Sequence, residues 1–308
     1  MISRRNIRVK VMQTIYTLST KDNDIKMGEP ARILQKHFDQ TRSLFIYLIH
    51  FLTEVARYSE KDAHIKASKH LPTVQDLNVN TKIAGNEIMW RMLEDPSLKS
   101  WALKEKPELI TDRELVRKIY FQLIETAQYQ TYILHQEREK KEEREILEFI
   151  FNTLLLPSES FVSHIEENFT NWEDDGEMVL QLLAGYLQKP GSIDFTNLLS
   201  LEKWDFARTL LTTVQEKSEH LLTYITPKLK NWDAERIAHL DMILMKMGVC
   251  EFLYFETIPP KVTINEYIDL AKDYSTAQSG HFVNGILDNI HKDLMQQGNM
   301  NKTDFKKA

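Results

Sequence analysis

The sequence has few residues that interrupt helices and almost none that form disulfides. It contains nine glycines, nine prolines and a single cysteine, Cys250, among 308 residues. Because glycine and proline are the poorest helix formers, their scarcity favours long helices. One cysteine excludes an intramolecular disulfide and any zinc site built from several thiolates.

Long apolar runs are also missing. The most apolar run, Leu44–Leu52, includes His50 and is far shorter than the ~20 residues that cross a bilayer. No apolar stretch follows the charges at the N-terminus, so no secretory signal is expected. We therefore expect a cytoplasmic protein with no membrane partner. Its 42% hydrophobic and 27% charged residues can form a core, while the net charge of −6 argues against indiscriminate coating of nucleic acid.

Motifs that indicate catalysis are absent as well. The chain has no G-x-x-x-x-G-K-[ST], no G-x-G-x-x-G and no H-E-x-x-H. A carboxylate-bridged metal bundle requires glutamate three residues before histidine, and none of the ten histidines has one. The nearest case, Asp288 before His291, stands alone. We expect a protein that is not an enzyme, with no catalytic residues, no metal and no cofactor, and with Cys250 in the core.

Helical patterns run through the whole chain. Ser3 is expected to cap a helix that continues to about Leu18. A second helix is expected from Ala31 to about Tyr58, with core residues Phe38, Phe45, Leu48, Ile49 and Leu52. Residues 59–80 are polar and interrupted by a proline, so we expect this stretch to be irregular or disordered.

Two T-x-x-E patterns, Thr111 with Glu114 and Thr263 with Glu266, predict capping boxes at helix starts. The first of these helices is expected to extend toward residues 137–149, and Gly176 is expected to separate two later helices. In the last third, helices are expected over 201–224, 233–255, 263–274 and from 279 onward. No segment alternates for long with the period of a strand, so the fold class is all-α.

Cations crowd the start of the first helix. Arg4, Arg5, Arg8 and Lys10 precede the first acid, Asp22, although cations oppose the macrodipole at a helix N-terminus. We expect the three arginines to project from one end while apolar residues of the same helix face inward. Guanidinium groups placed in this way suit phosphates and unpaired bases. The alternative is a basic terminus with no function.

A second unusual segment, Ser279–Gly285, opens the final helix. It places Phe282 beside a small polar loop, followed by Asn284 and a helix-weakening glycine. An aromatic ring at a helix N-terminus can serve as a platform for a base or a phosphate. The alternative is that Phe282 belongs to the core.

These motifs together resemble the NusB family. The N-terminal S-R-R-N-I-R-V-K-V-M-Q-T-I-Y is followed by P-x-K-V-x-I-N-E-x-I-x-L-A-K and by F-V-N-G-I-L-D, in the family order. The resemblance covers about residues 1–20 and 200–292. It implies two packed helical bundles of NusB type, with a large additional helical insertion in the N-terminal part that resembles the long NusB proteins of Bacteroidetes.

The resemblance also implies a function. It implies a transcription antitermination factor that binds boxA RNA of ribosomal RNA operons together with NusE, a small-subunit ribosomal protein, and acts indirectly with other Nus factors and RNA polymerase. The residues that it implies for RNA are Arg4, Arg5, Arg8, Lys10, Gln13, Tyr16, His281, Phe282 and Asn284. Those implied for NusE are Asp241 and Glu251. Asn6 and His281 replace cations of many relatives, so we expect RNA binding to depend strongly on NusE.

The expected organisation has four parts: a first helix over 1–20, a helical insertion over 21–199, a NusB-like bundle over 200–295 and a disordered tail over 296–308. Two alternative functions stay open. One is a helical protein–protein scaffold, homodimeric and without direct RNA binding. The other is an RNA-binding module related to N-terminal domains of ribosomal RNA methyltransferases, which requires a downstream cofactor domain that this sequence does not contain.

Overall fold

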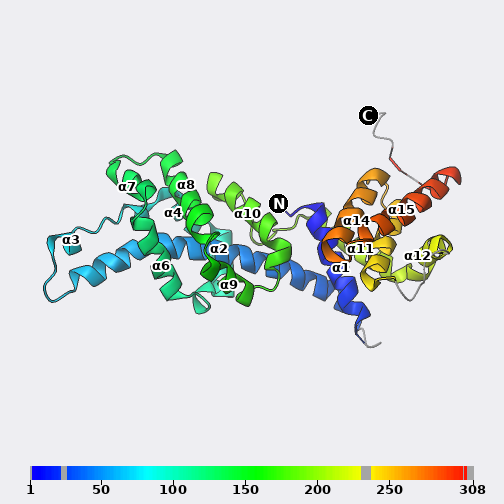
Figure 1. Cartoon of the computed structure of the whole chain (residues 1–308), viewed down its shortest axis with the longest axis horizontal. Helices are drawn as coiled ribbons and strands as arrows, with labels where there is room; N and C mark the ends of the chain where they lie inside the picture. The colour runs from blue at the N-terminus through cyan, green and yellow to red at the C-terminus, as the bar shows by residue number, and fades with distance from the viewer. Residues whose placement is uncertain (1, 22–25, 230–236, 301, 304–308) are drawn as a thin grey trace. The chain divides into compact units, whose positions relative to one another are not determined.

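The protein is built from helices. The computed structural model describes residues 2–21, 26–229, 237–300 and 302–303, and every regular element within these ranges is helical (Figure 1). The prediction of an all-α fold is confirmed. The chain divides into two compact units, one formed by Phe38–Leu198 and the other by Ile2–His37 together with Leu199–Ala308. Each unit is described separately below.

No single helix among the described residues is long and apolar enough to cross a membrane. By length and composition alone, one pair of segments bent by 87°, Lys140–Leu155 and Glu159–Asn168, meets the requirement together.

The Phe38–Leu198 unit is organised along α2 (Glu29–Ala67), whose first residues belong to the other unit. The helices that follow in this unit are α3 (Val74–Leu77), the 3-10 turn η1 (Lys82–Gly85), α4 (Glu87–Leu93), α5 (Pro96–Glu105), the 3-10 turn η2 (Pro107–Leu109), α6 (Arg113–Ile124), α7 (Ala127–Leu134), α8 (Lys140–Phe149), the π-helical turn η3 (Ile150–Leu155), α9 (Glu159–Asn168) and α10 (Trp172–Gln188).

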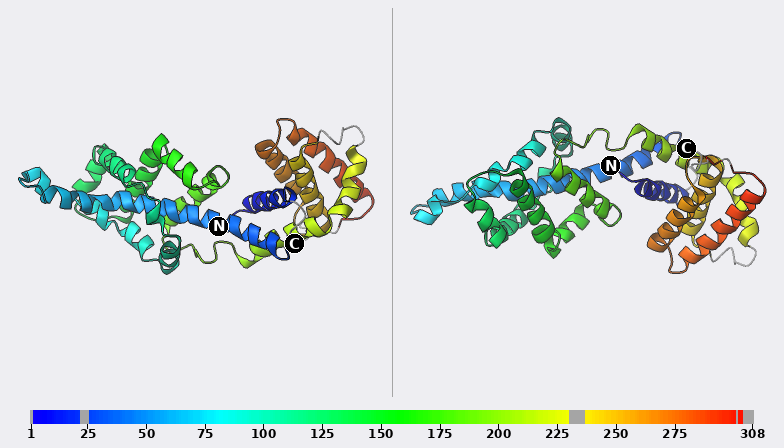
Figure 2. Two further views of the ribbon diagram at one scale, coloured as in Figure 1. Left: turned by 90° about the horizontal axis from the view of Figure 1, so that it is seen from below. Right: turned by 90° about the horizontal axis from the view of Figure 1, so that it is seen from above.

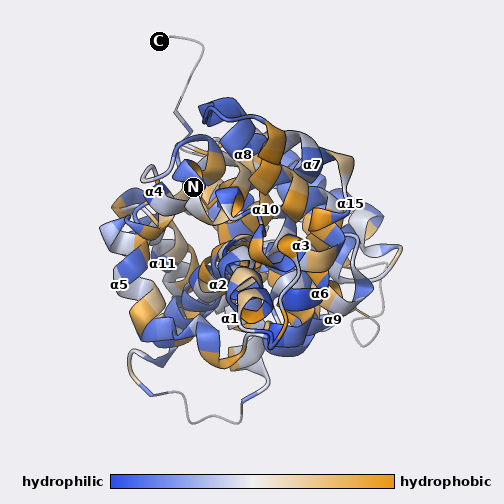
Figure 3. Ribbon diagram, turned by 90° about the vertical axis from the view of Figure 1, so that its left-hand side faces the viewer, coloured by the Kyte–Doolittle hydropathy of each residue, from blue (hydrophilic) through white to orange (hydrophobic). Residues whose placement is uncertain are grey.

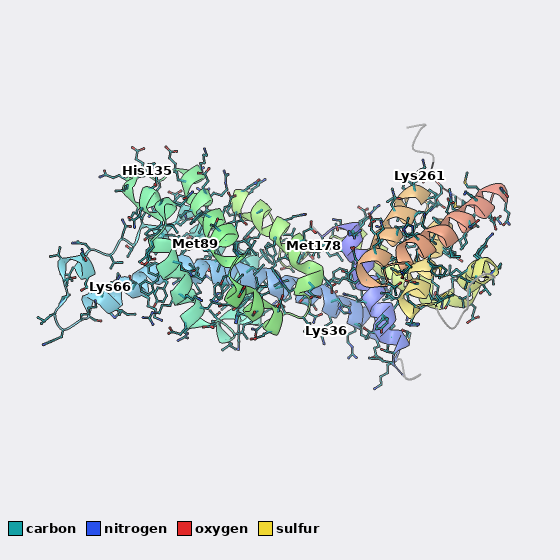
Figure 4. All side chains as sticks on the ribbon, viewed as in Figure 1. Lys36, Lys66, Met89, His135, Met178 and Lys261 are labelled. Carbon is teal, nitrogen blue, oxygen red and sulfur yellow. The ribbon has the colours of Figure 1, made fainter. Side chains whose placement is uncertain are left out.

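Aromatic packing along α2 forms the core of this unit. The ring of Phe45 lies 5.1 Å from that of Phe195, and the ring of Phe51 lies 4.9 Å from that of Phe161. Met89 of α4, labelled in Figure 4, is fully buried. The core residues expected for this helix are all buried, namely Phe38, Phe45, Leu48, Ile49 and Leu52.

The prediction of an irregular 59–80 stretch is wrong for 59–67 and for the four-residue helix α3, and it is confirmed for 68–73 and 78–80. Helix α2 continues to Ala67 because its second half packs against α6: the rings of Tyr58 and Tyr120 lie 5.1 Å apart, and the Tyr120 hydroxyl donates to buried Asp62. Lys66 pairs with Asp62 at 2.7 Å one turn earlier on the same helix. Tertiary burial therefore outweighs the polar composition on which the prediction depended.

Three other local predictions in this unit are wrong. The cap of α6 is Asp112, whose carboxylate accepts from two backbone N–H groups, whereas the Thr111 hydroxyl donates to the Pro107 carbonyl. The charged segment 137–149 is not an extension of α6, because α7 and a turn intervene before α8. Gly176 does not separate helices but lies inside α10, in contact distance of the Trp172 ring.

The second unit combines the two ends of the chain. Its helices are α1 (Arg4–Ser19), the first residues of α2, α11 (Leu201–Glu216), α12 (Ser218–Ile225), the 3-10 turn η4 (Thr226–Leu229), α13 (His239–Tyr254), α14 (Pro260–Tyr274) and α15 (Ser279–Gln296).

The predicted starts at Ser3 and Ser279 are confirmed. The expected helix over 201–224 is divided at Lys217 between α11 and α12. The expected start of the 233–255 helix lies outside the described residues, and the described helix begins at His239.

Helix α13 forms the centre of this unit. Its side chains are buried around most of its circumference, including Cys250, whose thiol pKa is raised by burial. α14 and α15 lie side by side and pack against it (Figures 1 and 2). Gly248 allows this close approach, since a Cβ there would lie 2.9 Å from both methyl carbons of Leu287. Elsewhere, as on α6 and α8, single helices carry hydrophilic and hydrophobic residues on different sides (Figure 3).

Candidate nucleic-acid interface

The N-terminus of α1 presents two arginines to solvent. Ser3 caps the helix by accepting from the Asn6 N–H at 3.2 Å, which fixes the direction of the first turn. Arg4 is 45% exposed and pairs with Glu202 at 3.0 Å, and its guanidinium lies 5.7 Å from the Phe206 ring centre. The Arg5 side chain is 37% exposed. These cations are therefore available at the surface, with acidic neighbours on α11 and α14.

Arg8 is not at that surface, and the expectation that it projects outward with Arg4 and Arg5 is wrong. Only 2% of its side chain is exposed. Its Nε donates to Glu251 Oε1 at 2.7 Å and its Nη2 to Glu251 Oε2 at 3.1 Å, while Nη1 donates to Glu266 at 3.3 Å. The physical reason is that α1 is covered on two sides, by α11 and by α13, so its buried arc is wider than one apolar stripe.

Glu251 is the hub of a buried polar network. Its side chain is 0% exposed and accepts from the Thr263 hydroxyl and the Tyr267 hydroxyl, both at 2.9 Å, in addition to Arg8. Burial opposes the charged form of Arg8, but the hydrogen bond and charge of Glu251 more than compensate, so the pKa of Arg8 is raised. The pKa of Tyr267 is also raised, first by burial and second by the nearby charge of Glu251. Arg8 and Glu251 form a buried ion pair joined by two hydrogen bonds.

This network also explains why the second capping-box prediction is wrong. Helix α14 begins at Pro260, with proline at its first position, so Thr263 and Glu266 lie inside the helix. Their side chains are used for Glu251 and Arg8 rather than for the helix end.

The remaining predicted positions on α1 differ in exposure. Lys10 is 1% exposed, so its expected availability to RNA is also wrong, for the same reason as that of Arg8. Gln13 is half-buried. Tyr16 is 46% exposed, and its ring lies 5.7 Å from that of His239. Ser19 is hydrogen-bonded to the same histidine at 2.6 Å, which ties the end of α1 to the start of α13.

The start of α15 presents polar side chains but not its aromatic ring. His281 and Asn284 are exposed, whereas Phe282 is only 7% exposed. Ser279–Gly285 is helical from its first residue, as predicted, and the small polar loop lies just before it at residues 275–278. Helical geometry turns residue 282 toward the bundle, so the expectation that the ring forms an open platform is wrong.

The end of α14 connects the two predicted parts. Arg5 Nη2 lies 2.6 Å from Asp273 Oδ2, and Arg5 Nη1 lies 3.9 Å from Asp269. On the same turn, the Lys272 side chain passes over the first turn of α15, since a Cβ on Gly280 would lie 2.7 Å from Lys272 Cγ. The structure therefore brings the α1 arginines and the start of α15 to neighbouring positions across α14.

Sequence reasoning missed Lys272 as a candidate. Its side chain is 58% exposed and belongs to this surface. The L-A-K pattern carried the signal, because it places a lysine in the last turn of a helix next to the S-G-H-F segment.

The two residues implied for a protein partner are both buried. Asp241 is 4% exposed and accepts from the Ser279 hydroxyl at 2.7 Å, and Glu251 is held in the network described above. The expectation that Asp241 faces a partner directly is wrong, because this carboxylate joins α13 to the start of α15. Among the described residues, no group of three or more histidine, cysteine or acidic side chains is placed to hold a metal ion.

Comparison with known proteins finds similarity to one family, over residues that span the end of the Phe38–Leu198 unit and most of the second unit. A family model described as the NusB family matches residues 169–292. No solved structure matches the chain.

Three similar proteins each carry the name Transcription antitermination protein NusB. The one from Salinibacter ruber is 44% identical over 99 residues, which are 32% of this chain and 62% of that protein. The one from Methylacidiphilum infernorum is 37% identical over 127 residues, 38% of this chain and 87% of the relative. The one from Chloroherpeton thalassium is 32% identical over 135 residues, 41% of this chain and 64% of the relative. The chain thus spans less than two thirds of the first and third relatives.

Proposed function

The chain belongs to the NusB family, and on that premise we propose that it is a transcription antitermination factor that binds boxA RNA together with NusE. The names of the three relatives support the first part of this proposal. The RNA and the protein partner are those implied by the sequence resemblance. The observation that carries the proposal is the pair of exposed arginines at the start of α1, next to the polar start of α15.

RNA would contact the exposed side chains of this surface. Arg4 and Arg5 offer flat guanidinium groups for phosphates and for stacking on unpaired bases. His281, Asn284 and the missed Lys272 extend the surface along α15 and the end of α14. Gln13 and Tyr16 continue it along α1.

The acidic neighbours of the arginines explain why a second protein would be needed. Arg4 and Arg5 already pair with exposed carboxylates, which a phosphate must displace. Such exposed pairs contribute at most about 1 kcal/mol each, so displacement is feasible but lowers the net gain. NusE would supply the additional contacts.

The buried predicted residues have a different role in this proposal. Arg8 and Lys10 would set the position of α1, and Phe282 would fix the start of α15, without touching RNA. Asp241 and Glu251 would affect NusE only through the helices that they hold together.

The test removes both exposed arginines. We expect Arg4→Ala/Arg5→Ala to weaken binding of boxA RNA to the NusE complex. The salt slope of binding should fall by about 0.7 for each phosphate that the variant no longer neutralises. The measurement is a fluorescence titration of labelled boxA and scrambled RNA at several salt concentrations, in the presence of NusE.

The matched control is Arg113→Ala/Arg117→Ala, which removes two exposed arginines from α6 in the other unit. Its affinity and salt slope should equal those of the wild type. The proposal is wrong if the α1 variant binds boxA RNA with wild-type affinity and salt slope, or if both RNAs bind the wild-type complex equally well.

A further inference from the structure

A groove lies between α7 and α8 in the Phe38–Leu198 unit, and none of the residues assigned to RNA or NusE lines it. Its volume is about 490 Å³. The described side chains that line it include Tyr132 from α7, His135 just after α7, and Glu142, Glu145, Ile146 and Phe149 from α8. The α8 residues follow one helical face, at spacings of three, one and three residues. His135 lies at the end of α7 (Figure 4).

The groove has an apolar floor, and the charged side chains at its rim are negative. Ile146 and the Tyr132 ring form the floor, and Phe149 is half-exposed beside them. Glu142 and Glu145 are the charged residues among the described lining residues, which include no lysine or arginine. A phosphate backbone would be repelled by these carboxylates, so the groove does not suit RNA.

Buried hydrogen bonds hold the walls of the groove in place. Glu143, 1% exposed, accepts from the Tyr132 hydroxyl at 2.7 Å and from the backbone N–H of Glu87 in α4 at 2.6 Å. Arg138 donates to both oxygens of the same carboxylate. A preformed groove of this kind needs little ordering when a ligand enters, which favours binding.

The two ends of the walls are also fixed. The Lys82 ammonium donates to the carbonyls of Tyr132 and His135, both at 2.7 Å, and so caps the end of α7. Across the groove, His135 Nδ1 lies 2.5 Å from Glu142 Oε1. Glu145 is 53% exposed and pairs weakly, at 3.7 Å, with Lys141 on its own helix.

We propose that this groove binds a basic amphipathic helix of a partner protein. The α7 wall from Ala127 to His135 is about 12 Å long, enough for about two turns of a docked helix. Apolar side chains at spacings of three and four residues would enter the floor, and lysines or arginines beside them would meet Glu145 and Glu142. The charge of the rim therefore selects a cationic helix over an acidic one and over nucleic acid.

The experiment uses a fluorescein-labelled synthetic peptide of about four helical turns, with leucines on one face and lysines on the other. A scrambled peptide of equal composition reports nonspecific attraction to an acidic protein. Binding to the full chain is followed by fluorescence anisotropy. We expect the amphipathic peptide to bind about tenfold more tightly than the scrambled one.

Two independent variants locate the site. Glu145→Lys reverses one rim charge, and Thr131→Trp fills the groove from the exposed side of α7 without changing its charge. Each should weaken binding of the amphipathic peptide by about tenfold or more. Glu167→Lys, the same charge change at an exposed position of α9, should leave the affinity within about twofold of the wild type.

Several outcomes would overturn the proposal. These are no detectable binding of the amphipathic peptide, equal binding of the scrambled one, or equal affinities of Glu145→Lys and Glu167→Lys. Tighter binding of RNA or of an acidic helix at this groove would also overturn it. Thermal melting of each variant checks that it is folded. Because RNA binding is measured separately with NusE, failure here leaves the proposed function unaffected.

Discussion

Removing Arg8 tests the buried network most directly. In Arg8→Met, the Glu251 carboxyl group would be 0% exposed and would lose its guanidinium partner, with the hydroxyls of Thr263 and Tyr267 as its remaining side-chain donors among the described residues. Loss of one partner of a buried ion pair typically costs about 3–5 kcal/mol, because the other charge is left uncompensated. That is a large part of the roughly 5–15 kcal/mol that typically stabilises a domain. We expect the free energy of unfolding to fall by about 3 kcal/mol or more, measured by urea denaturation.

The double variant separates the pair from its surroundings. In Arg8→Met/Glu251→Met both charges are replaced by apolar side chains of similar length, which is often neutral or stabilising for a buried pair. We expect the double variant to recover most of the stability that the single variant loses. If it folds, it should also bind boxA RNA with NusE as the wild type does, because Arg8 would position α1 rather than contact RNA.

Two results would refute this reasoning. Arg8→Met could unfold within about 0.5 kcal/mol of the wild type, as an exposed arginine would. Alternatively, the double variant could be fully stable yet lose RNA binding, which would show that Arg8 contacts RNA itself. Arg4→Met provides the exposed control, since its partner Glu202 is 80% exposed and its loss should cost about 1 kcal/mol or less.

Two further predictions concern close packing and protonation. Gly248→Ala should lower the free energy of unfolding by about 1 kcal/mol, because the close contact of the new Cβ with Leu287 outweighs the gain in helix propensity. Gly285→Ala has open space around the new Cβ, so it should raise the free energy of unfolding by about 0.5–1 kcal/mol. Urea denaturation of both variants measures the difference. Burial lowers the pKa of Lys302 to about 8, although Glu251 and Glu256 oppose the shift. The unfolded chain holds this proton up to about pH 10.5, so stability gained from Lys302 should appear as pH rises from about 8 to 10.5 and be lost as pH falls through about 8.

The controls for these predictions come from the same chain. Equal effects of alanine at positions 248 and 285 would contradict the packing argument. For Lys302, the difference in unfolding free energy between the wild type and Lys302→Met should grow by about 1 kcal/mol across that window, less than full linkage because the side chain is only half-buried. A difference that is independent of pH would contradict the assigned pKa.

The sequence predicted those parts of the fold that depend on local signals. The Ser3 cap, the α2 core residues and the start of α15 follow from capping chemistry and from helical periodicity. The second half of α2 could not be predicted from such signals, because its helical state depends on Tyr120, which packs against it from α6. Polar composition cannot reveal a partner that lies 58 residues away along the chain, as Tyr120 does from Asp62.

Only part of the candidate site could be predicted, again because some of its residues are placed by contacts that are distant in the sequence. Arg4 and Arg5 are exposed as expected. Arg8 was placed on the same surface because a single inward stripe was assumed for α1. Its burial depends on Glu251, 243 positions later, and on the two helices that cover α1. The T-x-x-E pattern at 263–266 was ambiguous locally, and only the tertiary structure shows which groups it bonds.

The pairing of Arg8 with Glu251 has a consequence for synthesis on the ribosome. The Phe38–Leu198 unit is one uninterrupted stretch of chain, so all its contacts become available while translation continues. The other unit requires α1 to find α13 and α14, which are synthesised after the whole of the Phe38–Leu198 unit. Until those helices emerge, α1 has no counter-charge for its buried arginine and no cover for its apolar faces. The interval before α13 and α14 are synthesised is therefore the one in which α1 is most exposed to contacts with other chains.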